Sequence, residues 1–239
     1  MFWLVGLLMG FGGGTDGIGL IIWFSALFVS ILIHELGHAL MIRRFGREAY
    51  IVLYAMGGLA IEGRPHSMYG SPWSFEPYTG YSPRSRTPQE QILISAAGPG
   101  IELVLAAVIV GIVYATGGHI RLSEGAIPLP VPVLGGELRG NVNLHLLVFD
   151  LLYINTFWAL VNLLPVLPLD GGQIALQILV HQDPWAGMQR ALWISVFTGG
   201  AMAIFSLVVM QQTFTMLLFA SLAVSSYLTL QQTGGRRPW

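Results

Sequence analysis

The chain has 239 residues, of which 54% are hydrophobic and only 10% are charged, and its mean hydropathy is +0.67. A soluble domain carries about 25% charged residues, so this composition excludes an ordinary soluble protein and predicts an all-α polytopic membrane protein. Cysteine is absent, which excludes disulfides and thiolate metal sites, and the net charge of −1 gives no reason to expect a nucleic-acid partner.

Hydrophobic stretches along the chain predict five to six transmembrane helices. Residues 1–11 are apolar but too few to cross a bilayer, which needs about 20 residues, so we expect an interfacial or re-entrant segment there. They also lack the basic start and cleavage site of a signal peptide. Five later stretches are long enough to span the membrane, at about residues 18–42, 91–115, 144–164, 189–209 and 214–230.

The segment between the first two spans divides into two parts. Residues 49–63 are two β-prone runs around Gly57-Gly58, which predicts a small membrane-associated β-hairpin. Residues 64–90 are rich in proline and aromatic residues without a clear period, so we expect irregular structure near the membrane surface.

Arginine placement predicts the orientation of the chain. Residues 43–86 carry six arginines, whereas residues 117–143 carry two arginines and two glutamates. By the positive-inside rule, the Arg43–Glu90 loop and the C-terminus are cytoplasmic. We expect this topology in a bacterial or archaeal cell membrane.

The first predicted span contains His34-Glu35-Leu36-Gly37-His38, an H-E-x-x-H motif. Its histidines are one helical turn apart on the same face, where both can bind one zinc ion, and a glutamate in this position is the usual general base for a zinc-bound water. His38 precedes Arg43 by about 8 Å of helix, which places the motif in the cytoplasmic half of the bilayer. Ionisable groups in such an apolar span usually mark a functional site. A structural carboxylate bonded to a neighbouring helix is the alternative for Glu35.

A third zinc ligand is expected from the end of the third span. A tetrahedral catalytic site has three protein ligands and one position open for water. The third span runs parallel to the first and ends at a turn broken by Pro165, Pro168 and the Gly171-Gly172 pair. Irregular backbone at membrane depth is tolerated only where it lines a protein cavity. Asp170 is the acid in this turn, on the same side as the histidines, although it is also a suitable N-cap for a helix beginning near Gln173.

These motifs together resemble the site-2 protease family of intramembrane zinc metalloproteases. The resemblance includes the H-E-x-x-H, Met56-Gly57-Gly58, the Gly98-Pro99 pair of the second span, and N-x-x-P-x-x-P-x-D-G-G from Asn162 to Gly172. It covers about residues 18–173, which would form the catalytic core of a single membrane-embedded domain over residues 1–239, followed by C-terminal helices at about 189–230. We expect a minimal core, because no PDZ-like insertion or nucleotide-sensing domain is evident.

The resemblance implies a role for each site residue. His34, His38 and Asp170 would hold one zinc ion per chain, Glu35 would be the catalytic base, and Asn162 would lie near the substrate. Asn162 is also our candidate for a donor to the oxyanion, with a structural hydrogen bond at a broken helix end as an equal alternative. The implied partners are the lipid bilayer and a transmembrane protein or peptide substrate.

Other polar residues in the spans have structural interpretations. Asn155 is expected to be structural, and Glu102 and Asp150 are expected to pair with a polar group or to lie near an interface rather than to take part in chemistry. Gly98, Pro99 and Gly100 would let the second span kink or approach a neighbour closely. The remaining histidines are expected in loops or at span ends: His66, His119, His145 and His181.

The predicted function is zinc-dependent hydrolysis of peptide bonds within the membrane, as in regulated intramembrane proteolysis. A membrane zinc transporter is one alternative, but it does not explain Glu35 in the base position. A catalytically silent membrane binding protein with the same His/Asp site is another. A zinc protease of a different membrane family, with a glutamate ligand on a later helix, is the third.

Overall fold

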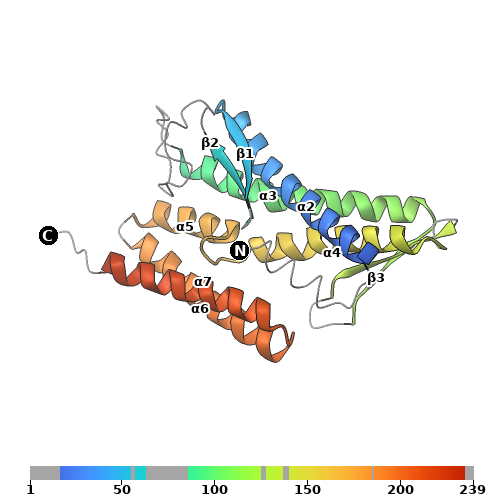
Figure 1. Ribbon diagram of the computed structural model, residues 1–239. Helices are drawn as coiled ribbons and strands as arrows, with labels where there is room; N and C mark the ends of the chain where they lie inside the picture. The colour runs from blue at the N-terminus through green and yellow to red at the C-terminus, as the bar shows by residue number, and fades with distance from the viewer. Residues whose placement is uncertain are drawn as a thin grey trace.

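The chain forms a helical membrane bundle with two small antiparallel sheets (Figure 1). The computed structural model describes residues 17–54, 57–62, 86–124, 128–136, 140–184 and 186–234. The expectations for residues 1–11 and for most of the loop 64–90 lie outside these residues. The elements in chain order are α2 (Gly17–Arg44), β1 (Ala49–Tyr54), β2 (Gly57–Glu62), α3 (Pro88–Ala115), β3 (His119–Leu122), β4 (Pro130–Val133), α4 (Val142–Asn162), α5 (Asp170–Gln182), α6 (Gly187–Val208) and α7 (Thr213–Gly234).

Five of the helices are long and apolar enough to cross a membrane, namely α2, α3, α4, α6 and α7. Their bounds agree with the five predicted spans to within a few residues, which confirms an integral membrane protein. Helix α5 has 13 residues, or about 20 Å at the α-helical rise, and is therefore too short to span.

Helices α2, α3 and α4 pack on one another and form the core that carries the motif (Figure 1). One apolar cluster joins α2 to α4 through residues such as Leu27, Ile31 and Phe157, and a second joins α3 to α4. Helices α6 and α7 form a hairpin, and α5 packs against both α3 and α6. This arrangement places the start of α5 beside the core.

Polar contacts set the ends and the register of these helices. Thr87 and Glu90 form a reciprocal capping box at the start of α3, so two of its first backbone N–H groups are paired. Within the bundle, the amide of the fully buried Asn155 on α4 donates to the Ser30 hydroxyl on α2 at 2.8 Å. This interhelical bond bears out a structural role for Asn155.

The two sheets lie at opposite ends of the bundle (Figure 1). The predicted hairpin is confirmed as β1 and β2, but the register pairs Tyr54 with Gly57 and Leu53 with Gly58. The glycine pair therefore lies within β2 and not at the turn. At the other end, β3 pairs with β4. The β3–β4 hairpin was not predicted, because its strands have four residues each and two of the four in β4 are prolines.

Candidate metal centre

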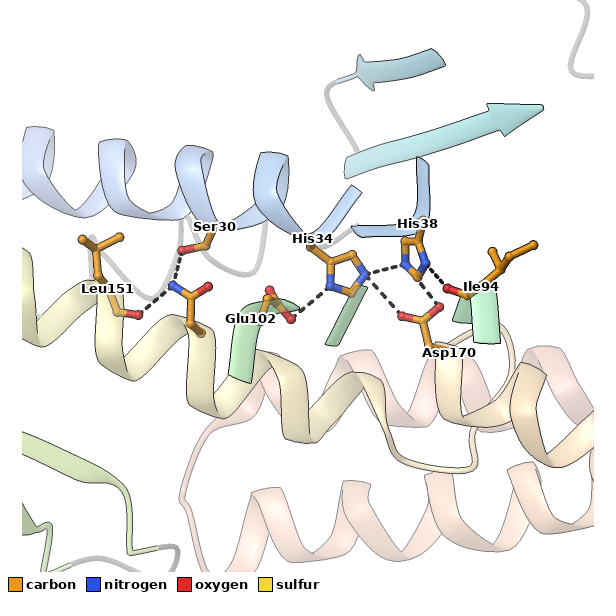
Figure 2. Close-up of polar contacts among 8 residues, drawn as sticks. Ser30, His34, His38, Ile94, Glu102, Leu151 and Asp170 are labelled. Carbon is orange, nitrogen blue, oxygen red and sulfur yellow. Dashed lines mark hydrogen bonds and ion pairs between the residues drawn. The ribbon is translucent and has the colours of Figure 1, made fainter. Parts of the chain in front are cut away.

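Three side chains from two distant parts of the chain converge in the bundle (Figure 2). The Nε2 atoms of His34 and His38 on α2 are 2.9 Å apart, and Asp170 Oδ2 and Oδ1 lie 3.2 Å and 3.5 Å from them, respectively. Donors placed tetrahedrally at about 2.1 Å from a zinc ion are about 3.4 Å from one another. The observed separations are close to this value, so the donor set fits a zinc ion.

The hydrogen bonds of the two Nδ1 atoms show that each imidazole directs its Nε2 atom at the cluster. His34 Nδ1 lies 3.0 Å from Glu102 Oε2, and His38 Nδ1 lies 2.7 Å from the carbonyl oxygen of Ile94 (Figure 2). Both partners accept hydrogen bonds, so each Nδ1 carries the proton and each neutral ring presents the Nε2 lone pair to the other and to Asp170. Two lone pairs 2.9 Å apart repel unless a cation or proton lies between them, which is the electrostatic requirement of a metal site.

Asp170 reaches this cluster from the first residue of α5. The N-cap position of α5 is Leu169, without a side-chain capping bond, so Asp170 is not the helix cap that its sequence context allowed. Each of its two carboxylate oxygens faces the Nε2 atom of one imidazole. The carboxylate is therefore available as an anionic ligand.

Two contacts fix the turn before Asp170, one with the start of α5 and one with α6. A Cβ on Gly171 would come within 2.5 Å of the Leu164 carbonyl oxygen, so only glycine allows the start of α5 to stack on this turn. The buried hydroxyl of Ser195 on α6 accepts a hydrogen bond of 2.9 Å from the backbone N–H of Leu167. Ser195 thus connects α6 to the segment that carries Asp170, a contact that was not predicted.

Helix α3 covers the open side of the two imidazoles. A Cβ on Gly98 would lie 2.6 Å from Cε1 of His38 and 2.8 Å from Cε1 of His34, so α3 can pack here only without a side chain. Close approach is thus the reason for glycine at this position. A Cβ on Gly100 would meet nothing within 4 Å, so close approach does not explain that glycine.

The other residues that the sequence singled out are not part of the His34, His38 and Asp170 group. Glu35 is buried on α2, directly after His34, and Asn162 is buried at the last residue of α4, where the turn to Asp170 begins. His119, His145 and His181 are in β3, α4 and α5, outside the group that could hold a metal ion, and His66 lies outside the described residues. Glu102 is paired with a polar group, as expected for an acid in a span, but its partner is a predicted metal ligand.

The chain is similar to known proteins of one family. Residues 22–206 match peptidase family M50. A Synechocystis protein whose name describes a zinc metalloprotease is 34% identical over 171 residues, which are 70% of this chain and 34% of that protein. A zinc metalloprotease of Methanocaldococcus jannaschii is 27% identical over 158 residues, which are 65% of this chain and 34% of its own length.

A solved structure shows the same fold. The site-2 protease from Methanocaldococcus jannaschii superposes with a TM-score of 0.53 at 20% identity, covering 96% of this chain and 86% of that one. The chain spans about a third of the length of the two curated relatives. The family match extends over most of the sequence and includes the helices that carry all three converging side chains. The chain therefore belongs to peptidase family M50, the site-2 protease family.

Proposed function

We propose that this chain is an intramembrane zinc metalloprotease that hydrolyses peptide bonds within or near transmembrane segments of other membrane proteins. The observation that supports it best is the His34, His38 and Asp170 cluster, in which both imidazoles direct Nε2 lone pairs at a carboxylate inside an apolar bundle. Glu35 lies on the same helix between the two histidines. We propose that each chain binds one zinc ion, with these three side chains as its protein ligands.

The proposed chemistry divides among a few side chains. A zinc ion, when bound, polarises a peptide carbonyl and lowers the pKa of water toward 7. Glu35 accepts the proton of the attacking water and delivers it to the leaving amine. The side-chain amide of Asn162 is our candidate donor to the carbonyl oxygen as negative charge develops there.

The proposed orientation places the cluster in the cytoplasmic half of the membrane. Helix α2 ends at Arg43 and Arg44, which belong on the cytoplasmic side by the positive-inside rule. The side chains of His38 and Asp170 are 12% and 16% exposed, so the cluster is not completely buried within the chain. We propose that water reaches it from the cytoplasmic side.

A transmembrane substrate must unwind before it is cut, because its carbonyls are paired within its own helix. The β1–β2 sheet packs against α2 and has two strands in the described part of the chain, so each strand has an outer edge. We propose that an unwound substrate segment adds to one of these edges through backbone hydrogen bonds. The physiological role would then be regulated intramembrane proteolysis.

A membrane zinc transporter remains the alternative from a different class. A transport path needs successive metal sites, and within the described residues the cluster of His34, His38 and Asp170 is the one group suited to a metal. Transport also gives no role to Glu35. Zinc flux into liposomes without proteolysis would favour the transporter.

The deciding experiment compares membranes of cells that express the wild type, Glu35→Gln or the control Glu124→Gln. Glu124 is exposed and follows β3 at the opposite end of the bundle, so the same change there tests for non-specific effects. We expect new protein termini within transmembrane segments with the wild type and Glu124→Gln, and their loss with Glu35→Gln. The purified Glu35→Gln protein should still bind zinc. Equal cleavage by wild type and Glu35→Gln would refute the proposed mechanism.

A further inference from the structure

Glu102 is an acid in the middle of an apolar helix, and its side chain makes a single contact that bears on the metal centre. It is fully buried on α3, and its Oε2 lies 3.0 Å from His34 Nδ1 (Figure 2). We propose that Glu102 is a positioning residue that raises the affinity of the cluster for zinc by orienting His34. This inference rests on the proposed zinc site but not on proteolysis.

The fold alone does not account for this carboxylate. Its second oxygen, Oε1, is buried without a hydrogen-bond partner among the residues that the structure describes. A buried carboxylate with one oxygen unpaired is less favourable than an apolar side chain of similar volume. Among the described residues, the hydrogen bond with His34 is the interaction that compensates for its burial, which points to a role at the metal centre.

The Nδ1 atom of His38 bonds to a backbone carbonyl, whereas that of His34 bonds to a side-chain carboxylate. α2 and α3 run antiparallel, since His38 meets Ile94 at the start of α3 and His34 meets Glu102 two turns later. The backbone carbonyl of Ile94 serves His38 and is present whatever side chain occupies that position. His34 depends on a side chain, so its orientation can be changed by mutation.

A spacing of four residues brings these features to one face of α3. Ile94, Gly98 and Glu102 follow one another at i, i+4 and i+8, which is one stripe of an α-helix. The first orients His38, the second leaves space for both rings, and the third orients His34. The stripe therefore holds both Nε2 atoms toward Asp170.

Charge supports the same role. Zinc carries two positive charges, of which Asp170 neutralises one. The carboxylate of Glu102, hydrogen-bonded to a ligating imidazole, adds negative charge near the ion in surroundings of low dielectric, and such a partner also makes the imidazole a stronger ligand.

The test measures the dissociation constant for Zn²⁺ of the purified full chain, by competition with a chromophoric chelator, together with thermal unfolding of the metal-free protein. The variants are Glu102→Leu, which removes the acceptor, and Glu102→Gln, which keeps an acceptor oxygen without the charge. Asp150→Asn is the matched control, because Asp150 is another buried acid in a span and lies outside the candidate metal group.

We expect Glu102→Leu to bind zinc about 10- to 100-fold more weakly, the usual effect of removing a partner of a metal-ligating histidine. Glu102→Gln should recover part of this loss, and Asp150→Asn should bind like the wild type. Metal-free Glu102→Leu should still unfold cooperatively, at a lower temperature than the wild type, because the buried His34 Nδ1–H loses its acceptor. With Co²⁺ bound, the visible absorption of Glu102→Leu should differ from that of the wild type and of Asp150→Asn.

Zinc affinity equal to that of the wild type in both Glu102 variants would overturn the proposal. If His38→Ala loses zinc in the same assay, the failure concerns Glu102 alone and leaves the proposed zinc site standing. A wild-type chain that binds no zinc would refute the zinc site and the positioning role together.

Discussion

Substitution of Gly98 by alanine tests whether α3 presses on both imidazoles. The added Cβ would lie 2.6 Å from Cε1 of His38 and 2.8 Å from Cε1 of His34. Non-bonded carbon atoms are ordinarily about 3.5–4.0 Å apart, so each ring must retreat by about 1 Å. Metal–ligand distances vary by only about 0.2 Å, so a shift of this size removes both Nε2 atoms from a shared ion.

We expect Gly98→Ala to weaken zinc binding by about 100-fold, at the upper end of the losses caused by misoriented ligands. Overpacking should also lower the free energy of unfolding by about 1–3 kcal/mol. Gly100→Ala is the matched control, because a Cβ there meets nothing within 4 Å and alanine favours helix. The assay is chelator competition for Zn²⁺ combined with thermal unfolding. Wild-type affinity in Gly98→Ala would show that the rings do not face α3 as described here.

Three further predictions concern the metal, the proposed oxyanion donor and the turn before Asp170. Removal of zinc by a chelator should abolish proteolysis, and one equivalent of Zn²⁺ per chain should restore it; activity that survives complete removal would contradict a zinc mechanism. Asn162→Ala should still bind zinc but should cleave about 10²- to 10³-fold more slowly. The rate is measured on a substrate identified by comparing membranes of cells with the wild type and Glu35→Gln. An unchanged rate would show that Asn162 has a structural role only. Ser195→Ala should leave the backbone N–H of Leu167 unpaired and lower the free energy of unfolding by about 1–3 kcal/mol in thermal unfolding, and an unchanged melting temperature would show that this bond is dispensable.

Local patterns were sufficient to predict most of the fold. The five spans follow from the length of each apolar stretch, because a bilayer of fixed thickness imposes a length on every helix that crosses it. The β1–β2 hairpin follows from β-prone runs, but the glycine pair suggested the wrong turn. Gly57 and Gly58 are in β2, since strand register depends on cross-strand pairing that the local sequence does not specify.

The three converging side chains could also be anticipated. His34 and His38 are four residues apart, which defines one helical face, and Asp170 follows a broken span that topology brings to the same side. The role of α3 could not be anticipated in the same way. The stripe of Ile94, Gly98 and Glu102 has a spacing that is visible in the sequence, but the face of α3 that meets the histidines depends on the rotation and depth of one helix against another.

The sequence by itself determined that this is a membrane protein with an H-E-x-x-H motif in its first described span and an acid at the end of its third. These properties depend on composition, periodicity and the number of membrane crossings, all of which are local or countable. Only the tertiary structure decided that Glu102 and Ile94 contact the two imidazoles, that Gly98 leaves space for them, and that Ser195 bonds to the turn before Asp170. These contacts join residues far apart in the chain, and they arise only when all the helices are packed together.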